Sequence, residues 1–392
     1  MIHVCHITTV HQPFDTRIFH KECKTLAKTG YEVSLIAPKA DNNQMTNDQI
    51  TTVVDEVKMI YLPEARNRFF RILCLTKKAY KIALKQKANI YHFHDPEFLP
   101  WAIKLKEKTG SKTIYDVHED TPQQILSKKW IPKILRRPIA SIFNFYEKQK
   151  ARHLDFVITA WPVIKEKFER EGINNIEVVA NYPVIGNLQL TTEYRQHKAK
   201  NEETKLIYAG GLTRIRGIKE MVKSLGFIKN DVKLILLGKF QEEGLEEELK
   251  ELSEWRKVEF KGWLSQKAAY KNMRESDIGL ICFLPAPNHI NAIPNKLFEY
   301  MASGLPVVAS NFPLWERVVK TNKCGLTVNP EKPKEIAKAI KYLIEHPQEA
   351  KKMGENGKKA VFEKYNWEKE SKKLLTIYKN LEYRKSKFFY ED

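Results

Sequence analysis

One segment places a cation and a carboxylate near the expected start of a short helix: NAIPNKLFEYMASGLPVVAS, residues 291–310. Pro294 suits the first turn of a helix because its missing N–H would have no partner there. Gly304, followed by Leu-Pro, predicts the helix end. Free N–H groups and the helix dipole attract anions at the helix start, and Lys296 adds a positive charge there. Glu299, about one turn further along, can accept two hydrogen bonds from a ribose diol. The segment therefore predicts a phosphate-and-ribose site, with an ordinary capped helix as the alternative.

A second segment with phosphate chemistry is KLIYAGGLTRIRGIKEMV, residues 205–222. A β-rich run enters Gly210-Gly211, and Arg214 and Arg216 precede a helical pattern. Glycines let the backbone approach a diphosphate closely, and guanidinium groups bind it through paired hydrogen bonds. The spacing is not G-x-G-x-x-G, so a dinucleotide fingerprint is not supported. The alternative is a glycine turn with two solvated arginines.

Two histidine-containing segments follow β-rich runs in the first half of the chain. IYDVHED (114–120) carries His118, and HFHDPE (92–97) carries His94, Asp95 and Glu97. In α/β proteins, ligands lie at the carboxyl ends of parallel strands, where these side chains are expected. A satisfied loop histidine is the alternative for His118. A zinc site at His92 and His94 is not favoured, because the pattern implies no metal-ligand geometry.

The elements that position these residues alternate between β-rich runs and helical patterns, which predicts parallel sheets covered by helices. The rhythm runs through the first half, stops in the polar stretch 186–203 and restarts at 205–209. We therefore expect an α/β fold of two Rossmann-like domains, residues 1–185 and 204–367, joined by a linker at 186–203. The amphipathic end of the chain, about 368–392, could pack on either domain, the first included.

Length and composition fit this organisation. A chain of 392 residues with 42% hydrophobic residues is long enough for two cores and too apolar for a disordered protein. The five cysteines are scattered, which argues against a disulfide framework and fits a reducing compartment. The sequence contains neither a secretory signal pattern nor an apolar run of membrane-spanning length. These features predict a cytoplasmic protein.

The formal net charge of +19 predicts an anionic partner. Two basic stretches without acids, 66–87 and 127–145, lie in the N-terminal half and contain aromatic and aliphatic residues. Our hypothesis is that they rest on an anionic membrane surface at the inner face of the cell membrane. An ordinary solvated face is the alternative. The usual signatures of nucleic-acid-binding modules are missing from the sequence, so no nucleic acid partner is expected.

Taken together, several segments resemble glycosyltransferase family 4, the retaining enzymes of GT-B fold, as found in bacterial polysaccharide and cell-envelope synthesis. The resemblance lies in YAGGLTRIRGIKE, FKGWLS (260–265) and PNKLFEYMASGLPVVAS, with the opening HITTVHQPFDTRIFHKECKTLAKTGYEVSLIA, IYDVHED and NYPV. It covers most of the chain. It implies two Rossmann-like domains with parallel sheets facing across a cleft, and a nucleotide-sugar donor.

The resemblance also implies roles for individual residues. His118 and Asn291 would lie at the reaction centre. The loop from His11 to Arg17 would form the acceptor-side floor. The implied donor-binding residues are Gly211, Arg214, Arg216, Gly262, Trp263, Leu264, Asn295, Lys296, Leu297 and Glu299. The acceptor-side candidates are Asp15, Arg17, His94, Asp95 and Glu119.

Two positions depart from the family pattern. The family places two glutamates eight positions apart, but Asn291 stands where the first, sugar-contacting one is expected. Asparagine carries no charge, yet it can hydrogen-bond sugar hydroxyls. Gly211 stands where many relatives carry arginine, and Arg214 is a candidate to compensate. The donor sugar is therefore not assigned by the resemblance.

The expected function is retaining transfer of a sugar from a nucleotide-diphosphate sugar, with a UDP-sugar favoured, to a glycan or lipid-linked acceptor in polysaccharide or cell-envelope biosynthesis. No cofactor and no metal are expected, because the sequence shows no D-x-D signature between β-rich runs. The alternatives are a nucleotide-sugar epimerase on the same fold, or a non-catalytic nucleotide- or nucleic-acid-binding protein.

Overall fold

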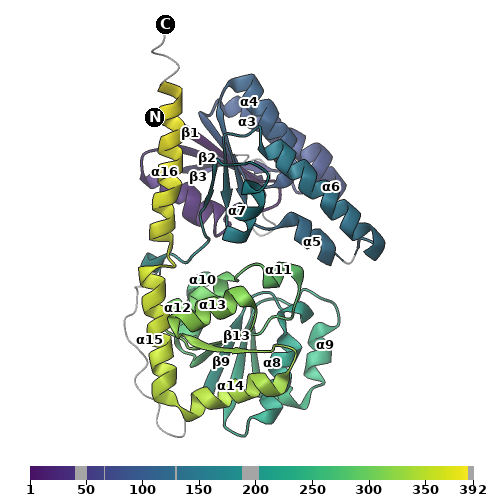
Figure 1. Cartoon of the computed structure of the whole chain (residues 1–392), viewed down its shortest axis with the longest axis vertical. Helices are drawn as coiled ribbons and strands as arrows, with labels where there is room; N and C mark the ends of the chain where they lie inside the picture. Colours follow the sequence, from purple (N-terminus) through teal and green to yellow (C-terminus); the bar gives the residue numbers. More distant parts are fainter. Residues whose placement is uncertain (40–50, 66, 129, 188–202, 387–392) are drawn as a thin grey trace. The chain divides into compact units, whose positions relative to one another are not determined.

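The computed structural model describes residues 1–39, 51–65, 67–128, 130–187 and 203–386 (Figure 1). The chain divides into two compact units, Met1–Asn181 with Trp367–Asp392, and Tyr182–Asn366. Most of the predicted linker, residues 188–202, lies outside the described residues. None of the described helices combines the length and the apolar character needed to cross a membrane.

The first unit is built on a sheet of order β3-β4-β2-β1-β5-β6-β7-β8. All neighbouring strands are parallel except the antiparallel pair β3 and β4. The central strands are almost wholly buried, as expected for a parallel sheet covered on both faces. The strands are β1 (His3–Ile7), β2 (Glu32–Pro38), β3 (Thr51–Val54), β4 (Val57–Leu62), β5 (Ile90–Phe93), β6 (Lys112–Val117), β7 (Phe156–Thr159) and β8 (Ile176–Val178).

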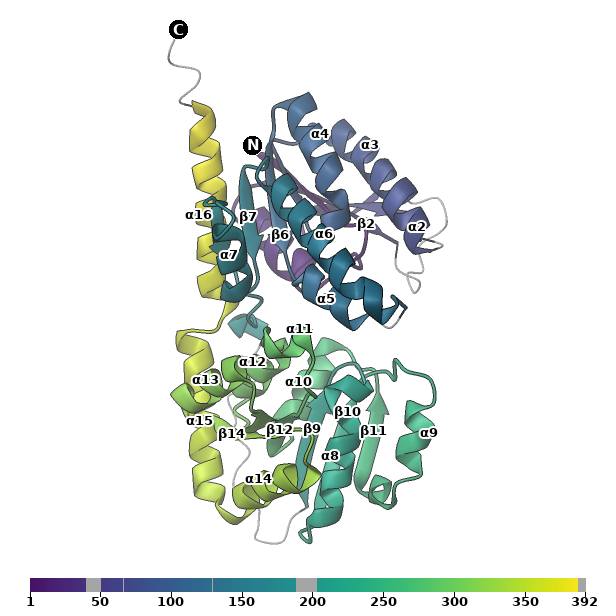
Figure 2. The same ribbon diagram turned by 45° about the vertical axis from the view of Figure 1, so that its right-hand side comes forward.

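The helices of the first unit include the last helix of the chain. This helix, α16, packs beside η1, while α3, α4 and α6 lie next to one another (Figure 2). A wider, π-type turn forms η1, and such turns are frequent at functional sites. The helices are η1 (Ile18–Cys23), α1 (Lys24–Lys28), α2 (Arg68–Phe70), η2 (Arg71–Leu75), α3 (Thr76–Gln86), η3 (Pro96–Phe98), α4 (Leu99–Thr109), α5 (Thr121–Ser127), α6 (Lys133–Ala151), α7 (Pro162–Glu169) and α16 (Trp367–Ser386).

The second unit contains a parallel sheet of order β11-β10-β9-β12-β13-β14. Its strands are β9 (Thr204–Ala209), β10 (Val232–Leu237), β11 (Val258–Gly262), β12 (Ile278–Ile281), β13 (Val307–Ser310) and β14 (Gly325–Val328). Its helices are η4 (Ile185–Asn187), η5 (Arg214–Arg216), α8 (Ile218–Ser224), η6 (Leu225–Phe227), α9 (Leu245–Lys250), η7 (Ser253–Lys257), α10 (Gln266–Arg274), α11 (Pro287–Ile290), α12 (Asn295–Ala302), α13 (Pro313–Asn322), α14 (Pro333–Glu345) and α15 (Pro347–Glu363).

The predicted α/β fold class is confirmed, and the β-rich runs that lead into the His94, His118 and Gly210 segments form β5, β6 and β9. The hairpin of β3 and β4 was not predicted. Its turn residues Asp55 and Glu56 both have positive φ, 49° and 65°. Such turns usually carry glycine or asparagine, so the Asp-Glu pair gave no hairpin signal.

Both sheets contain a point at which the strand order reverses. In the first unit the chain starts at β1 and places β2 on one side and β5 on the other. In the second unit β9 lies between β10 and β12 in the same way. Loops leaving the carboxyl ends of the two strands at such a point diverge and form the usual ligand crevice of open α/β sheets. Several candidate residues of each unit lie on the loops at these two points, whereas Gly262, Trp263 and Leu264 lie at the end of β11 and His118 follows β6.

Candidate functional site

In the second unit, the loop that leaves β9 is held tightly against the end of β12. A Cβ atom added to Gly217, whose φ is +69°, would lie 1.9 Å from the backbone oxygen of Cys282. Tyr208 Oη donates a hydrogen bond to the Gly211 carbonyl at 3.0 Å, and Arg216 Nη1 donates to the same oxygen at 3.2 Å. The predicted glycine and arginine residues are therefore fixed at the carboxyl end of β9.

The two arginines of this loop have different surroundings. Arg214 is paired with Glu242 at 3.0 Å and with Glu248 at 2.6 Å. Arg216 instead stacks over the Phe283 ring, with its guanidinium carbon 5.6 Å from the ring centroid. Arg214 thus braces the loop through carboxylates of its own unit, which leaves Arg216 the better candidate for a diphosphate.

The helix predicted from the 291–310 segment is α12. Pro294 is its cap residue (φ −69°, ψ 139°), and among the described residues no side chain caps this end. Lys296 Nζ donates to Glu299 Oε2 at 2.5 Å, so the predicted cation and carboxylate form a pair one turn apart. Asn295, the first helical residue, is half-buried. The start of α12 therefore combines uncapped backbone N–H groups with a lysine and a glutamate.

Leu297 and Glu299 lie differently on this helix. The Leu297 side chain is fully buried in the core, and its N–H donates to the Pro294 carbonyl at 3.0 Å. The Glu299 side chain is 15% exposed and lies near Tyr270. Burial, with the nearby Glu299 charge, raises the pKa of Tyr270 above its ordinary value. Leu297 therefore anchors the helix, whereas Glu299 keeps an accessible edge.

Tyr300 ties α12 to the end of β9. Its buried hydroxyl accepts a hydrogen bond from the Ala209 N–H at 2.8 Å. Its ring lies over Gly279 of β12, where an added Cβ would come within 2.6 Å of the ring. The helix carrying Glu299 is thus fixed against β9 and β12, the two strands that flank the reversal of strand order.

Asn291 follows the short helix α11, on the connection between β12 and α12. Its Nδ2 donates to the Pro287 carbonyl at 3.2 Å, and the side chain is half-buried. Trp315 Nε1 donates to the Ala292 carbonyl at 2.7 Å and so fixes the neighbouring backbone. The structure therefore places Asn291 on the same connection as the α12 tip.

The predicted base-reading residues lie at the carboxyl end of β11. Gly262 has φ +68°, and its carbonyl accepts a hydrogen bond from Gly238 N–H at 2.8 Å. The Trp263 side chain is 67% exposed, with Lys239 Nζ 6.0 Å from its ring centroid, and Leu264 is half-buried. An exposed tryptophan at this edge of the sheet offers a stacking surface.

In the first unit, Asp95 lies just after β5, at the point between β1 and β5 where the strand order reverses. Its Oδ2 accepts hydrogen bonds from Thr9 N–H at 2.6 Å and Thr8 Oγ1 at 2.9 Å. Its Oδ1 lies 3.8 Å from His11 Nε2. Asp95 is buried, and its hydrogen bonds to Thr8 and Thr9 hold the loop that follows β1.

His11 and Asp15 face each other across the same loop. Burial alone would lower the pKa of His11, but its hydrogen bond to Asp15 and the Asp95 charge raise it above the usual 6.5. Asp15 Oδ1 also accepts hydrogen bonds from the N–H groups of Arg17 and Ile18, at 2.8 and 3.0 Å. Asp15 therefore shapes the start of the first helical segment in addition to pairing with His11.

Arg17, predicted on the acceptor side, makes internal contacts instead of presenting an exposed guanidinium. Its Nε and Nη2 donate to both oxygens of Asp116 at 2.8 Å, and its Nη1 donates to the Val179 carbonyl at 2.7 Å. Both side chains are buried. Burial would raise the pKa of Asp116, but the charges of Arg17 and His118 hold it well below its ordinary value.

His118 lies directly against this buried carboxylate. Its Nε2 is 2.9 Å from Asp116 Oδ2 and 3.1 Å from His94 Nδ1, and its side chain is 12% exposed. Glu119, the next residue, is exposed. His118 is thus an oriented histidine at the edge of a buried charged network, which is the arrangement that positions an imidazole for catalysis.

Several members of this network were not predicted from the sequence. His6 Nδ1 is 3.0 Å from His94 Nε2, and His92 Nδ1 is 2.7 Å from Tyr378 Oη of α16. Glu22 is also completely buried. The available signal was the presence of histidines inside runs that otherwise read as buried strands, since polar side chains in such strands need partners.

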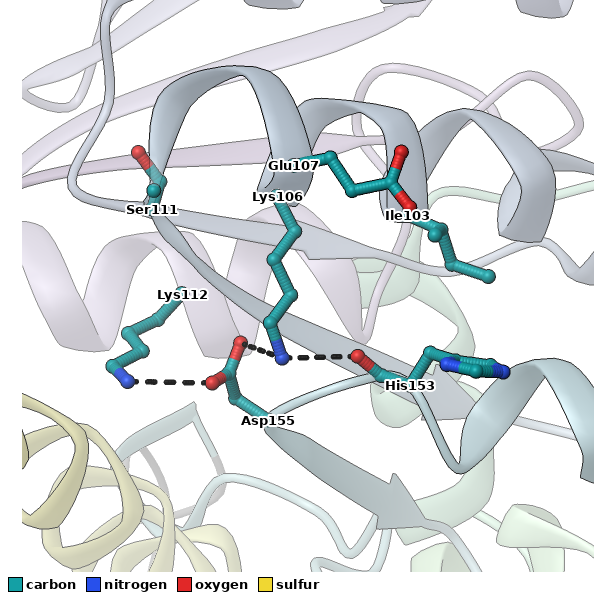
Figure 3. A pocket seen from close by; sticks show the side chains of 8 residues that line it. Ile103, Lys106, Glu107, Ser111, Lys112, His153 and Asp155 are labelled. Carbon is teal, nitrogen blue, oxygen red and sulfur yellow. Dashed lines mark hydrogen bonds and ion pairs between the residues drawn. The ribbon is translucent and has the colours of Figure 1, made fainter.

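A hollow of about 400 Å³ lies elsewhere in the first unit (Figure 3). It is lined by residues at the amino ends of β6 and β7, opposite to the edge that carries His118. Asp155 pairs there with Lys106 at 3.1 Å and Lys112 at 3.3 Å, as Figure 3 shows. None of the predicted site residues lines it.

Both halves of the chain match models of known protein families. Residues 16–182 match the family model described as Glycosyltransferase Family 4, and residues 191–360 match that of Glycosyl transferases group 1. This chain belongs to glycosyltransferase family 4. It is therefore a nucleotide-sugar-dependent glycosyltransferase of a retaining family.

Individual relatives of this glycosyltransferase are distant. An uncharacterized glycosyltransferase of Methanocaldococcus jannaschii is 25% identical over 252 residues, which are 64% of this chain and 58% of that protein. Sucrose-phosphate synthase of Thermosynechococcus elongatus superposes with a TM-score of 0.74 at 19% identity, over 97% of this chain and 99% of that one. Anabaena HepE in complex with UDP gives a TM-score of 0.72 at 14% identity, over 97% and 100%. These solved structures share the fold.

Proposed function

We propose that this glycosyltransferase moves a sugar from a UDP-sugar to a glycan or lipid-linked acceptor in polysaccharide or cell-envelope synthesis, at the cytoplasmic face of the membrane. The observation that carries the donor part is the placement of Arg216, the α12 tip and Glu299 around one reversal of strand order. Open α/β sheets bind their ligands at that point.

The proposed donor site stabilises a leaving nucleoside diphosphate. Negative charge develops on the diphosphate as the glycosidic bond breaks, and preorganised donors stabilise it without rearranging water. Arg216 supplies a fixed guanidinium stacked on Phe283, and the start of α12 supplies N–H groups and Lys296. Glu299 would accept hydrogen bonds from the ribose, and Trp263 would stack on the base.

Uridine is the base that the comparisons favour. Anabaena HepE, which shares the fold, has been solved with UDP and with UDP-glucose. Asn291 occupies the position at which the family pattern has a sugar-contacting glutamate. An amide can hydrogen-bond hydroxyl groups without adding negative charge beside the diphosphate. We therefore assign Asn291 to donor-sugar recognition.

The proposed reaction centre includes His118. Cleavage of the donor builds positive charge on the anomeric carbon, as in glycoside hydrolysis. His118 is held by Asp116, whose own charge is balanced by Arg17 through paired hydrogen bonds. These contacts fix the orientation of the His118 imidazole. Retention would follow from attack on the face that the diphosphate leaves, with a diphosphate oxygen taking the acceptor proton.

A basic and apolar surface of the first unit supports a membrane-associated acceptor. The two basic stretches meet where the Arg68 guanidinium lies 4.3 Å from the Trp130 ring centroid. Arg66 and Lys129 of these stretches lie outside the described residues. Large apolar side chains are exposed beside them: Phe69, Leu73, Trp130, Ile134, Ile142 and Phe145. Such a surface can insert apolar groups into a bilayer and attract anionic headgroups.

This membrane-binding surface is connected to the acceptor-side loop. Arg71 of η2 pairs with Glu97, with Nε 2.9 Å from Oε1. Glu97 Oε1 also accepts a hydrogen bond from Thr9 Oγ1 at 2.8 Å. Thr9 in turn donates its N–H to Asp95. A lipid-linked acceptor held at the surface would therefore lie beside the loop that carries the acceptor-side residues.

A thermal-shift panel of UDP-, GDP- and ADP-sugars tests the donor. A ligand that binds the folded state at 100 times its Kd stabilises the protein by about 2.7 kcal/mol, so the correct donor raises the melting temperature. We expect the UDP-sugars to give the largest shift. Product analysis with and without acceptor then separates transfer from epimerisation. A panel without any shift would contradict the proposed donor site.

Co-sedimentation with liposomes tests whether the basic and apolar surface of the first unit binds membranes. We expect binding that requires anionic lipid and weakens by roughly tenfold in Ile134→Ala, which removes an exposed apolar side chain. Phe227→Ala, at an exposed phenylalanine of the second unit, is the control and should bind as wild type. Binding that is indifferent to anionic lipid would contradict the proposal.

A further inference from the structure

We infer that His6, Glu22, His92 and His94 form a buried binding site for a transition-metal ion with the preferences of Zn²⁺. All four side chains are buried, and one ligand atom from each lies within 4.8 Å of the other three. Imidazole nitrogens and a carboxylate oxygen are a common ligand set for Zn²⁺. This inference does not rest on the proposed function.

His92 and Glu22 bury polar atoms whose partners in the protein are incomplete. Among the described residues, His92 Nε2 is buried without a hydrogen-bond partner, and the buried Glu22 carboxyl group faces Arg17 and Asp116. Arg17 Nε lies 3.0 Å from Glu22 Oε1 and contributes charge, but its hydrogen bond goes to Asp116. Buried polar atoms without partners are costly, and a cation between them would remove that cost.

Each of the three histidines has an outer partner for one of its ring nitrogens. His92 Nδ1 is 2.7 Å from Tyr378 Oη, which is also 3.5 Å from His6 Nε2. His94 Nδ1 is 3.1 Å from His118 Nε2 and 3.5 Å from Asp116 Oδ2. Metal-binding histidines use the second nitrogen in this way, which fixes the ring and its tautomer. His92 Nε2 has no hydrogen-bond partner among the described residues, whereas His6 Nδ1 and His94 Nε2 are hydrogen-bonded to each other at 3.0 Å and would exchange that bond for bonds to the ion.

The backbone supports this convergence. His6 and His92 are directly opposite each other in the register of β1 and β5, and His94 follows on the same side two residues later. Glu22 approaches from η1 and offers a carboxylate oxygen within 4.8 Å of a ring nitrogen of each of the three histidines. Ligands of a tetrahedral ion at about 2.0–2.2 Å are roughly 3.3–3.6 Å apart, so side-chain movements of about 1 Å close the site.

The electrostatics are compatible with a divalent ion. The three imidazoles would bind the ion in their neutral form, and Glu22 would bind it as the carboxylate after losing its proton. The Arg17 charge is balanced by Asp116 through paired hydrogen bonds. The Glu22 carboxylate then balances part of the ion's charge.

The proposed ion is structural and lies behind His118, on the side of His94 away from solvent. It would join β1, β5 and η1 and fix His94, which contacts His118. It differs from a donor-diphosphate metal, which the sequence did not predict. Because the ligands are buried, the ion would enter during folding and resist chelators in the native state.

Metal analysis of the whole protein tests the inference. We purify the chain from zinc-supplemented cells, treat it with EDTA, remove the chelator and measure bound metal before and after unfolding in guanidinium with a zinc-sensitive dye. We expect about one equivalent per chain, released only on unfolding. Refolding with Co²⁺ should give the visible absorption bands of a tetrahedral ion.

Two variants locate the ion. Glu22→Gln keeps the shape of the side chain and should lower the metal content at least tenfold or change the Co²⁺ bands, whereas His153→Gln, at an exposed histidine, should change neither. Should Glu22→Gln fail to fold, the wild-type metal content and Co²⁺ spectrum decide alone. Wild-type protein without bound metal and without Co²⁺ bands would overturn the inference, as would a Glu22→Gln variant with unchanged metal and spectrum.

Discussion

Lys296 and Glu299 pair on the first turn of α12, with the lysine Nζ 2.5 Å from Glu299 Oε2. The pair holds the carboxylate on the side of the helix tip and partly neutralises it. One ligand would therefore contact both side chains, with its diphosphate near Lys296 and its ribose near Glu299. Tyr300, the next residue, fixes the helix to the backbone of β9, so the pair has a defined position relative to Arg216.

Arg216 should matter more than Arg214. Arg214 already pairs with Glu242 and Glu248, whereas Arg216 contacts a carbonyl, an aromatic ring and the hydroxyl of Tyr208. We expect Arg216→Ala to lower kcat/KM by about 10²–10³-fold, because a preorganised donor to the leaving group is lost. Arg214→Ala should cost less than about tenfold. Steady-state kinetics of both variants check this, and a larger loss for Arg214→Ala would reverse the assignment.

Gly217 should tolerate no side chain. Its φ is +69°, and an added Cβ would lie 1.9 Å from the Cys282 oxygen. Gly244 is a matched control, because its φ is +71° but an added Cβ meets nothing within 4 Å. We expect Gly217→Ala to lower the unfolding free energy by about 1–3 kcal/mol more than Gly244→Ala, and also to weaken nucleotide binding. Denaturant unfolding and calorimetric titration measure both effects. Equal losses in the two variants would argue against the close approach.

Removal of the His118 imidazole should stop turnover without affecting donor binding. His118 lies on the Asp116 network of the first unit, while the proposed donor residues all lie in the second. We expect His118→Ala to lower kcat about 10²–10⁴-fold and leave nucleotide affinity within about twofold. His153→Ala serves as the control for loss of an exposed histidine. Full activity of His118→Ala would retire its proposed role.

The buried histidines predict loss of stability in acid. Burial lowers the pKa of His94 from 6.5 to about 4, so between these values the unfolded chain binds more protons than the folded one. The unfolding free energy should therefore fall as the pH drops from about 6.5 to about 4, by on the order of 3 kcal/mol for His94. His6 and His92 act in the same direction.

Urea unfolding at successive pH values measures this loss. His94→Gln should flatten the slope, because it removes one of the groups that gain a proton on unfolding. His11 works in the opposite direction, because its pKa is raised in the folded state and its contribution is lost as the pH rises. Stability that stays constant or increases below pH 6.5 would contradict the neutral state of the cluster.

The fold was largely predictable because its strands are apolar and rich in β-branched residues. The runs around Val4, Val157 and Val307 are examples of strands buried on both faces. The hairpin around Asp55 and Glu56 was not predictable, because its turn lacks glycine. That turn depends on tertiary packing rather than on local sequence preference.

The contacts of the candidate sites were predictable only where the interacting residues are close together in the sequence. Lys296 and Glu299 are three residues apart, so helical spacing alone brings them together. Arg17 and Asp116 are 99 positions apart, and nothing in the sequence shows that they pair. The contact of His6 with His94 likewise depends on the register of β1 and β5. Long-range pairing is therefore what sequence patterns missed.

The proposed function depends most on Glu299 binding the ribose of a nucleoside diphosphate. The most direct test measures the affinities of wild type and Glu299→Ala for UDP and for 2′,3′-dideoxy-UDP by calorimetry. We predict that wild type binds UDP about 10–100-fold more tightly than the dideoxy analogue, and that Glu299→Ala binds both alike, because the hydrogen bonds to a charged group are worth about 1.5–3 kcal/mol. Wild type that does not distinguish the two ligands, or a variant that still does, would contradict it.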